Sequence, residues 1–507
     1  MKLGRLLSVL NEKEFHGDEH YDIISIVSHS AAVQDKTLFV AIPGARVDGH
    51  DFLDIAYQAG ARAFVTQRPF FKPDASTIIV PDARQALSLL AAEFYDQPTR
   101  AVTLIGITGT NGKTTITYLL ESILQHAGHQ VGVLGTVEYR CGSYREIAGQ
   151  TTPEPMALQH VLRDMVQRGA RYIVMEVSSQ GLDQRRVDGC QFDIGVFTNL
   201  SPEHLDYHRT LENYYRSKER FFTQVLLNSA KKPVRAIINQ DDPHGQKLAH
   251  SIPVPCLTYG ISAGDIHATS VLRSSAGISA DLNFPGGTMT VRSPLIGMFN
   301  LYNILAAAST ALSLNLPLAA IGAGIEAVTR IPGRMERIEN QRGILVLVDY
   351  AHTGDALENA LQTVKDITAR KVITVFGCGG DRDREKRPVM GAVAARYSDV
   401  VIITSDNPRS EPPEQIIADI EIGVRTAGVS KALDRYAAHH NSVKSYLVYP
   451  DRAVAIHEAI ALARPGDSVL IAGKGHETTQ HIGAQKFPFD DREAARRALH
   501  DSAAATG

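Results

Sequence analysis

A glycine-rich segment between an apolar run and an amphipathic run constrains the fold more than any other feature of the sequence. The apolar run AVTLIG leads into Gly106-Ile107-Thr108-Gly109-Thr110-Asn111-Gly112-Lys113-Thr114-Thr115, and TTITYLLESILQHAG follows, with Gly128 as its predicted C-cap. This order predicts a buried strand, a tight turn and a helix, the unit that begins a doubly wound parallel sheet.

The same segment predicts a phosphate site. Backbone N–H groups of a glycine-rich turn and of a helix N-terminus bind phosphate, Lys113 would neutralise it, and the Thr114 hydroxyl would hold Mg²⁺. The strict Walker pattern requires glycine where Ile107 stands. Glu176 ends the strand-like run RYIVMEV, so it is placed to offer a carboxylate to the same metal.

Length and pattern predict an α/β protein of about three domains, because 507 residues exceed what one core usually holds. Short apolar runs alternate with helix-like stretches up to Gln97-Pro98, and a new α/β series begins after Ile331-Pro332-Gly333. We therefore expect a small N-terminal α/β domain over 1–98, a central P-loop ATPase-like parallel sheet over 99–331 and a third α/β domain over 332–507.

Composition excludes several classes of protein. Lys+Arg 52 against Asp+Glu 55 leaves a net charge of −3, so no nucleic-acid or anionic-membrane partner is expected. The four cysteines include no C-x-x-C pair, which argues against a disulfide framework and favours a reducing cytoplasm. The first residues lack the apolar core of a signal peptide, and no run of about 18 apolar residues predicts a membrane span.

Four strand-like runs of the third domain each end in polar residues. These ends are Asp349-Tyr350-Ala351-His352, Cys378-Gly379-Gly380-Asp381-Arg382, Asp406-Asn407-Pro408-Arg409 and Gly473-Lys474-Gly475-His476-Glu477. Ligands of open α/β sheets bind outside the carboxyl ends of the strands, so four such ends predict a ligand-binding edge.

Motifs along nearly the whole chain resemble the Mur ligases, in a superfamily of ATP-dependent amide-bond ligases that includes the folylpolyglutamate synthetases. The first is TGTNGKTT. The others are Thr151-Thr152-Pro153, MEVSSQGLDQRRV, TNLSPEHLDYH followed by Lys218, PGRME, VDYAHT, GCGGDRDREKRP, DNPR and GKGHE. Within the family they look like the members that add the third peptide residue to UDP-N-acetylmuramoyl-L-alanyl-D-glutamate in peptidoglycan precursor synthesis.

The resemblance implies a uridine-nucleotide domain, an ATPase domain and a Rossmann-like domain for the incoming amino acid. It implies that ATP phosphorylates the substrate carboxylate to an acyl phosphate, which the amine of the amino acid then attacks. A free carboxylate is a poor acyl donor, and phosphorylation supplies a good leaving group. Catalysis of phosphoryl transfer rests mainly on positioning and charge neutralisation, here by Lys113 and Mg²⁺.

Site residues follow from the same resemblance. Lys218 matches the lysine that is carbamylated in this family, and His204 matches a histidine that accompanies a second metal; with Lys113 they form the expected catalytic set. Expected metal ligands are Thr114, Glu176, His204 and Lys218. Expected ATP contacts are Gly109, Thr110, Asn111, Gly112, Lys113, Thr114, Thr115, Asn303, Arg334 and Asp349, and expected contacts of the UDP-substrate are Ser30, Thr151, Thr152, Ser178, Gln184 and Arg186.

Arg409 indicates which amino acid is added. A guanidinium forms a planar fork that matches a carboxylate, and meso-2,6-diaminopimelate carries a distal carboxylate that L-lysine lacks. In this family DNPR looks like the diaminopimelate-adding pattern. The expected amino-acid site comprises Arg382, Asp406, Asn407, Pro408, Arg409, Gly473 and Glu477.

Departures from the family pattern keep alternatives open. His29-Ser30-Ala31 stands where most members carry Asp-Ser-Arg, Gln180 replaces a histidine and Gly354 replaces a proline. The alternatives are a ligase that adds L-lysine or acts on another carrier, a ligase like folylpolyglutamate synthetase, and a non-catalytic P-loop protein. We expect a cytoplasmic monomer.

Overall fold

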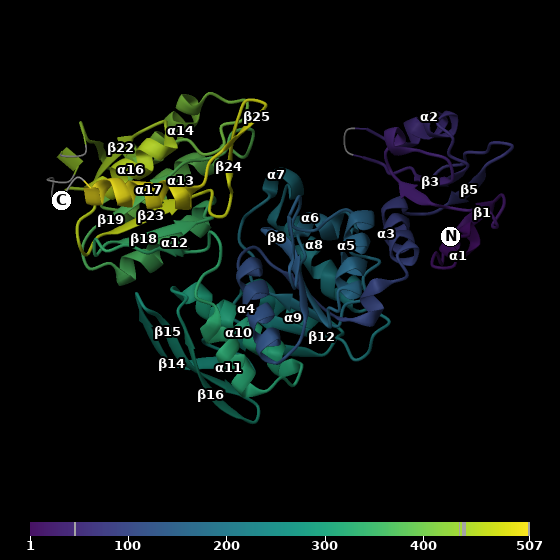
Figure 1. Ribbon diagram of the computed structural model, residues 1–507, viewed down its shortest axis with the longest axis horizontal. Coiled ribbons are helices and arrows are strands. Elements are labelled where there is room, and N and C mark those ends of the chain that lie inside the picture. Colours follow the sequence, from purple (N-terminus) through teal and green to yellow (C-terminus); the bar gives the residue numbers. More distant parts are fainter. Residues whose placement is uncertain (45–46, 435–436, 439–442, 505–507) are drawn as a thin grey trace.

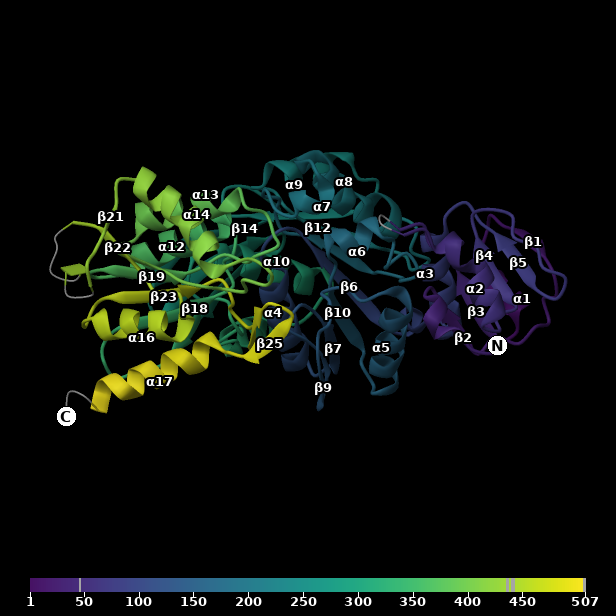
Figure 2. The same cartoon turned by 90° about the horizontal axis from the view of Figure 1, so that it is seen from above.

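Three β-sheets lie in a row along the long axis of the molecule, in chain order from the N-terminus to the C-terminus (Figures 1 and 2). The computed structural model describes residues 1–44, 47–434, 437–438 and 443–504. The central sheet lies between the other two.

The N-terminal sheet is small and mostly parallel. Helices α1 (Leu3–Leu7) and α3 (Ala83–Phe94) cover one face, and α2 (Leu53–Gln58) covers the other. The small α/β domain predicted from the sequence is confirmed. Its strands, in the order β1-β5-β4-β3-β2, are β1 (Glu14–His16), β2 (Ser25–Val27), β3 (Thr37–Val40), β4 (Ala63–Thr66) and β5 (Ser76–Ile79), and only β1 is antiparallel.

The central sheet has a parallel core that carries the glycine-rich turn. Its strands read as almost continuous apolar runs because helices bury both faces. The parallel strands, in spatial order, are β13 (Cys256–Gly260), β12 (Arg235–Asn239), β11 (Ile194–Phe197), β6 (Thr103–Thr108), β10 (Tyr172–Glu176) and β7 (Val131–Leu134).

Helices cover this parallel core on both faces. One face packs against α4 (Lys113–His126), α10 (Met298–Ser313) and α11 (Leu318–Ala327). The other packs against α5 (Pro155–Gln167), α8 (Leu211–Arg220) with the π-helix Phe221–Leu226, and α9 (Pro243–Ser251). The short helices α6 (Ser179–Asp183) and α7 (Leu205–His208) follow β10 and β11 at their carboxyl ends. The predicted strand, turn and helix are thus confirmed, and Gly128 follows the end of α4 at φ +82°.

Two extensions of the central sheet were not predicted from the sequence. β14 (Ile266–Ser274) is paired in parallel with β13, and β15 (Gly277–Phe284) and β16 (Gly287–Ser293) continue antiparallel. At the other edge, β8 (Glu138–Cys141) and β9 (Tyr144–Ile147) form an antiparallel hairpin on β7. Buried and exposed residues alternate along β16, so its apolar signal per residue is weak.

The C-terminal sheet has seven strands with only β17 antiparallel, and its helices lie on both faces. Helices α12 (Gly354–Ile367), α13 (Lys386–Tyr397) and α14 (Pro413–Thr426) cover one face, and α16 (Arg452–Leu462) and α17 (Asp491–Ala504) cover the other. The strand order is β17 (Glu336–Ile338), β18 (Leu345–Asp349), β23 (Ser468–Ala472), β19 (Val372–Phe376), β20 (Val400–Ile403), β22 (Ser445–Val448) and β21 (Ser430–Lys431).

The four polar strand ends predicted to form one edge follow β18, β19, β20 and β23. These strands are parallel neighbours, so their carboxyl ends lie along the same edge of the sheet. A separate hairpin, β24 (Thr479–Ile482) and β25 (Gln485–Pro488), follows the β23 end. Among the described helices, none has both the length and the apolar character to cross a membrane.

Candidate functional site

The turn between β6 and α4 requires its glycines. Gly109 and Gly112 have φ of +144° and +91°, a region that L side chains rarely adopt. A Cβ at Gly109 would lie 1.8 Å from Thr198 Oγ1, and one at Gly112 would lie 2.3 Å from Asn303 Oδ1. The chain therefore passes close to Thr198 and Asn303. At the carboxyl end of β6, the first N–H groups of α4 have no partner within the helix and are free to bind a ligand.

Lys113 lies against this turn. Its Nζ donates hydrogen bonds to the carbonyl oxygens of Gly109 (2.9 Å) and Thr110 (2.7 Å). Burial lowers the pKa of the Lys113 ammonium, while the nearby carboxylates of Glu176 and Glu203 act in the opposite direction. Lys113 lines the cavity that the turn borders.

The Glu176 carboxylate, only 1% exposed, ends β10 beside the turn. Its Oε1 accepts hydrogen bonds from Thr114 Oγ1 (3.0 Å) and from the backbone N–H of Thr136 (2.9 Å), and its Oε2 accepts one from Thr136 Oγ1 (3.0 Å). Thr136 also contacts Thr151, with 3.1 Å between the hydroxyl oxygens. Thr136 was not predicted as a site residue, because it follows β7 without any motif of its own.

Lys218 lies on the other side of the turn, on α8. It is 1% exposed, its Nζ donates to Gly109 O at 2.9 Å, and the ammonium lies 4.4 Å from the centre of the Tyr214 ring. Burial, and then the charge of Lys113, lower the pKa of Lys218 well below its ordinary value. Lys218 is therefore not a solvent-exposed lysine on the surface of α8.

Glu203 and two histidines join the central and C-terminal domains. Glu203 Oε1 lies 3.4 Å from His352 Nε2 and 3.9 Å from His204 Nε2. Burial opposes ionisation of Glu203, but the hydrogen bond and charge of His352 hold its pKa far below the usual range. Burial lowers the pKa of His204. Glu203 was not predicted, although it lies inside the quoted run SPEHLD.

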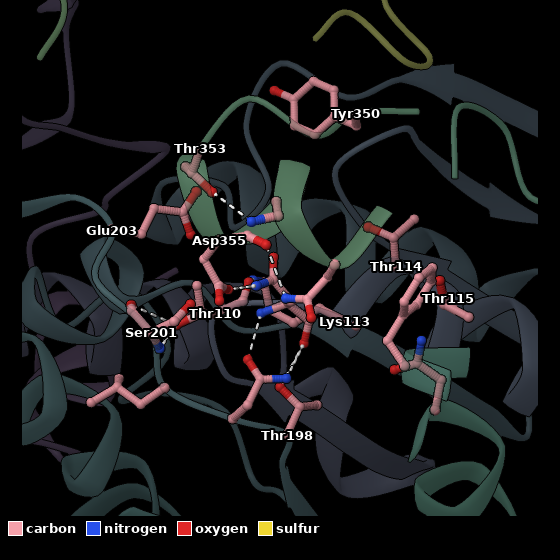
Figure 3. Close-up of a pocket in the computed structure, with 18 of the residues that line it drawn as sticks. Thr110, Lys113, Thr114, Thr115, Thr198, Ser201, Glu203, Tyr350, Thr353 and Asp355 are labelled. Carbon is pink, nitrogen blue, oxygen red and sulfur yellow. Dashed lines mark hydrogen bonds between the residues drawn. The ribbon is translucent and has the colours of Figure 1, made fainter. Parts of the chain in front are cut away.

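One cavity of about 850 Å³ unites these groups (Figure 3). Asn111 Nδ2 lies 3.4 Å from Asp355 Oδ2, and Arg334 Nη2 lies 3.4 Å from Thr114 Oγ1, so the C-terminal domain closes one side of the cavity. The predicted residues that line it are Thr110, Asn111, Gly112, Lys113, Thr114, Thr115, Thr151, Thr152, Glu176, Ser178, Arg186, His204, Lys218, Asn303, Arg334 and Asp349.

The residues present fit a nucleoside triphosphate with a hard divalent cation. The glycine turn leaves no room for a Cβ, the α4 N-terminus and Lys113 offer positive charge, and Thr114 and Glu176 offer hydroxyl and carboxylate oxygens. Asp349 ends β18 and accepts hydrogen bonds from the backbone N–H groups of Met335 (2.6 Å) and Ala351 (2.8 Å). Burial raises the pKa of Asp349.

The predicted UDP-substrate residues of the central domain form a connected group. Thr152 Oγ1 donates to Glu176 O at 3.0 Å and accepts from the Ser178 N–H at 3.0 Å. Arg186 donates to Thr152 O (2.7 Å) and to Gln184 Oε1 (2.6 Å). Gln184 does not line the large cavity, and Ser30 lies after β2 in the N-terminal domain, away from that cavity.

The predicted amino-acid residues gather at the carboxyl edge of the C-terminal sheet, outside the lining of the large cavity. Asn407 Nδ2 donates to Glu477 Oε2 at 2.8 Å. Buried Lys474, which was not predicted although it lies in the quoted run GKGHE, donates to Asn407 Oδ1 and Glu477 Oε2, both at 3.0 Å. Gly473 has φ of +117°, and a Cβ there would lie 3.6 Å from Asp406 Oδ2.

Arg409 lies beside this group, and its backbone forms a hydrogen bond with the β24–β25 hairpin. Its Nη1 donates to Gly380 O at 2.6 Å, and its backbone N–H donates to His481 O at 3.0 Å. A Cβ at Gly380 would lie 1.9 Å from Pro408 O, so that glycine allows the two loops to meet. Arg382 lies on the loop after β19 and is exposed.

Three side chains in series connect the amino-acid edge to the large cavity. The Arg334 guanidinium lies 4.6 Å from the centre of the Tyr350 ring, and Tyr350 in turn lies 4.9 Å from the ring of His476. Burial lowers the pKa of His476 to about 3. Arg334 and Tyr350 line the large cavity, and His476 belongs to the polar end of β23. These contacts therefore link the large cavity to the amino-acid edge.

Models of the Mur ligase family match three segments of the chain. The Mur ligase family catalytic domain matches residues 20–95, the Mur ligase middle domain matches 107–311, and the Mur ligase glutamate ligase domain matches 333–475. Together these segments span most of the sequence.

Curated relatives and solved structures agree with those matches. A UDP-N-acetylmuramoyl-L-alanyl-D-glutamate–2,6-diaminopimelate ligase of Geobacter metallireducens is 49% identical over 504 residues, covering 99% of each chain, and one of Geobacillus thermodenitrificans is 44% identical over 99% of this chain and 100% of the relative. A solved ligase of the same name superposes with a TM-score of 0.70 at 33% identity over 99% of this chain and 100% of the other. A MurF ligase from Thermotoga maritima in complex with ADP has a TM-score of 0.61 at 19% identity, covers 96% of this chain and 99% of its own, and supports the fold alone.

Proposed function

Because the chain belongs to the Mur ligase family, we propose that it is an ATP-dependent ligase that adds meso-2,6-diaminopimelate to UDP-N-acetylmuramoyl-L-alanyl-D-glutamate. One observation carries the proposal: a single cavity brings the glycine turn, Glu176 and Lys218 of the central domain against Arg334 and Asp349 of the next. A nucleotide and an acceptor carboxylate bound there would be neighbours.

The proposal assigns one principal ligand to each domain, with further contacts from the neighbouring domain. Residues 1–98 bind the uridine end of the UDP-substrate, 99–331 bind ATP, and 332–507 receive the amino acid. The row of sheets supports this assignment, since the central domain lies between the other two. The reaction would take place in the cytoplasm, with the chain acting as a monomer.

The central domain would supply the electrostatics of phosphoryl transfer. ATP provides a good leaving group for the substrate carboxylate, and Mg²⁺ would neutralise phosphate charge when held by Thr114 and Glu176. Lys113 and the α4 N-terminus stabilise negative charge on the phosphates, and Asn303, Arg334 and Asp349 orient the nucleoside. These groups act by position, because phosphoryl transfer needs charge neutralisation more than covalent help.

Lys218 has the surroundings that carbamylation requires. Only a neutral amine attacks CO₂: a N–C bond forms, one proton leaves, and the product is an anionic carbamate with two oxygen atoms. The lowered pKa of Lys218, caused first by burial, supports a neutral amine in this position. The carbamate would offer hard oxygen ligands to a cation, with His204 nearby.

Arg186 and its neighbours would hold the peptide end of the UDP-substrate. Thr151, Thr152, Ser178 and Gln184 offer hydroxyl and amide groups, and Arg186 offers a guanidinium to a carboxylate. The hydrogen bonds from Arg186 to Thr152 O and Gln184 Oε1 hold that guanidinium beside the cavity. The distal carboxylate of diaminopimelate would pair with Arg409, and its ammonium with the acids at the same edge.

A reconstitution assay tests the proposed function. Purified protein should release phosphate from ATP at a high rate only when both UDP-N-acetylmuramoyl-L-alanyl-D-glutamate and meso-diaminopimelate are present. Mass spectrometry of the product should show the added diaminopimelate. Equal or faster turnover with L-lysine would refute the assigned amino acid, and turnover that does not require the UDP-substrate would refute the assigned acceptor.

A rescue experiment tests the carbamate. Lys218→Ala should lose most activity and recover part of it when short-chain carboxylates such as acetate are added, because these restore an anionic oxygen ligand. Lys247→Ala is the control, since this lysine stacks on the Tyr215 ring at 4.5 Å outside the cavity lining and its loss should change neither rate nor rescue. Full activity of Lys218→Ala without added carboxylate would contradict the carbamate.

A further inference from the structure

Lys474 is a buried ammonium at the centre of the amino-acid edge. It follows β23 through Gly473 and is 0% exposed. Its Nζ lies 3.0 Å from Asn407 Oδ1, 3.0 Å from Glu477 Oε2 and 3.7 Å from Asp406 Oδ1. A buried ammonium is costly unless it is paired, and these partners are three residues of the predicted amino-acid site.

The ammonium determines which atoms of Asn407 and Glu477 face a ligand. Donation from Lys474 Nζ, together with the His481 N–H at 3.0 Å, keeps Oδ1 of Asn407 on the inner side. The Asn407 amide nitrogen then points toward Glu477 and donates to its Oε2. Glu477 Oε2 accepts from both Asn407 and Lys474, so one oxygen of this carboxylate is held by protein donors.

Asp406 adds an acceptor that protein groups do not satisfy. Its Oδ1 is buried and, among the described residues, has no hydrogen-bond partner, since Lys474 Nζ lies beyond hydrogen-bond distance at 3.7 Å. A buried carboxylate oxygen without a partner carries a free-energy cost that a bound ammonium would remove. Asp406 Oδ1 therefore remains an acceptor available to a ligand ammonium.

Charge balance gives Lys474 a second effect. Asp406 and Glu477 carry two negative charges, and Lys474 neutralises one, so the acids present a net charge of about −1 to a ligand ammonium. Arg409 supplies a separate positive charge on the same edge, with its Nη1 2.6 Å from Gly380 O. The edge thus matches a group that carries one ammonium and one carboxylate.

We propose that Lys474 is a positioning residue that sets the amino-acid specificity of the ligase by orienting Asn407 and Glu477 and by neutralising one of the two acids. The proposal rests on the proposed function, and it concerns the distal, zwitterionic end of the incoming amino acid. Lys474 acts through its neighbours, because its two hydrogen bonds go to Asn407 Oδ1 and Glu477 Oε2 and its third contact is the ion pair with Asp406.

The test is a kinetic comparison of Lys474→Met with wild type. Without the ammonium, Asn407 and Glu477 lose their fixed orientation and the two acids repel each other. The KM for diaminopimelate should therefore rise at least about tenfold, while kcat at saturating diaminopimelate and the KM values for ATP and the UDP-substrate change little. Lys444→Met is the matched control, because this lysine of the same domain donates to Ala395 O (2.9 Å) away from the edge.

Two outcomes would contradict the proposal. An unchanged KM for diaminopimelate in folded Lys474→Met, or an equal loss in the KM of all three substrates, would overturn the positioning role. If Lys474→Met does not fold, Lys474→Gln replaces it in the same assay, since it keeps one donor for Asn407 and removes the charge.

The wild-type protein shows separately whether the proposed function fails. Wild-type protein would then not turn over diaminopimelate, and the Lys474 comparison is made with the amino acid that it does use. A normal KM for that amino acid in the variant would overturn the inference on its own.

Discussion

At the scale of single residues, the proposed amino-acid specificity rests on the cation at the carboxyl edge of the C-terminal sheet. Arg409 is half-buried and keeps its guanidinium near the Asp406, Asn407 and Glu477 group by donating to Gly380 O. A guanidinium can bind a carboxylate with two parallel hydrogen bonds, whereas a lysine ammonium acts as a point charge. The specificity proposed for this protein therefore depends on the shape of the cation as well as on its charge.

Arg409→Lys should reduce the preference for diaminopimelate over L-lysine by about 10- to 100-fold, or about 1.4–2.7 kcal/mol, because the fork to the distal carboxylate is lost. The measurement is the ratio of kcat/KM for the two amino acids. Arg396→Lys is the control, since Arg396 lies 5.4 Å from the Tyr397 ring on α13 and should leave the ratio unchanged. A wild-type ratio in Arg409→Lys would remove Arg409 from the site.

At the scale of elements, helix α11 supports the helix that carries the glycine turn. Gly324 of α11 packs directly on α4, and a Cβ there would lie 2.4 Å from the Ile123 Cα. Backbone atoms cannot move aside as a flexible side chain can, so this glycine is required by the close approach of two helices. Gly322, on the same helix, faces open space apart from Met289 Cε at 3.9 Å.

Gly324→Ala should destabilise the protein by about 1–3 kcal/mol, because the added methyl group forces α11 away from α4. Gly322→Ala should be neutral or stabilise it by up to about 1 kcal/mol, since alanine favours the helix and fits there. Thermal unfolding midpoints of the two variants and wild type measure the difference. Equal midpoints for both variants would show that the α4–α11 contact is not as close as described.

The helices and strands were largely predictable from the sequence, because their signals lie within each segment. The strand, turn and helix around Lys113 carry their own periodicity and glycines, and the parallel strands of the third domain are uninterrupted apolar runs. The strands β14, β15 and β16 escaped prediction because they are not continuous apolar runs: β14 is mostly exposed, and buried and exposed residues alternate along most of β16. Their stability comes from packing α11 against β16.

At the scale of the whole molecule, the N-terminal domain meets the central one next to Arg186. The buried hydroxyl of Ser88, on α3, donates to Arg186 O at 3.0 Å and accepts from the Gly189 N–H at 2.9 Å. A Cβ at Gly189 would lie 2.2 Å from Ser88 O, so the backbones of the two domains are in close contact. This junction sets the position of the N-terminal domain relative to a proposed substrate residue.

Ser88→Ala leaves a buried N–H and a buried carbonyl without this partner, at a cost of about 1–3 kcal/mol. Because the junction lies beside Arg186, the KM for the UDP-substrate should rise at least about threefold while the KM for ATP stays at the wild-type value. Ser251→Ala, which removes a hydrogen bond within α9 only, serves as the control for steady-state kinetics. A change in the KM for ATP alone would contradict this role of the junction.

The sequence by itself determined the three α/β units, the family and most residues around the glycine turn, because local patterns and ordered motifs carry that information. Only the tertiary structure decided which residues share a cavity: Glu203 reaches His352 across 149 positions, and Lys474 reaches Asn407 across 67. It also decided that Lys218 and Lys474 are buried lysines, which no pattern distinguishes from exposed ones. Burial and partners arise from packing between distant segments, and they determine what a charged side chain can do.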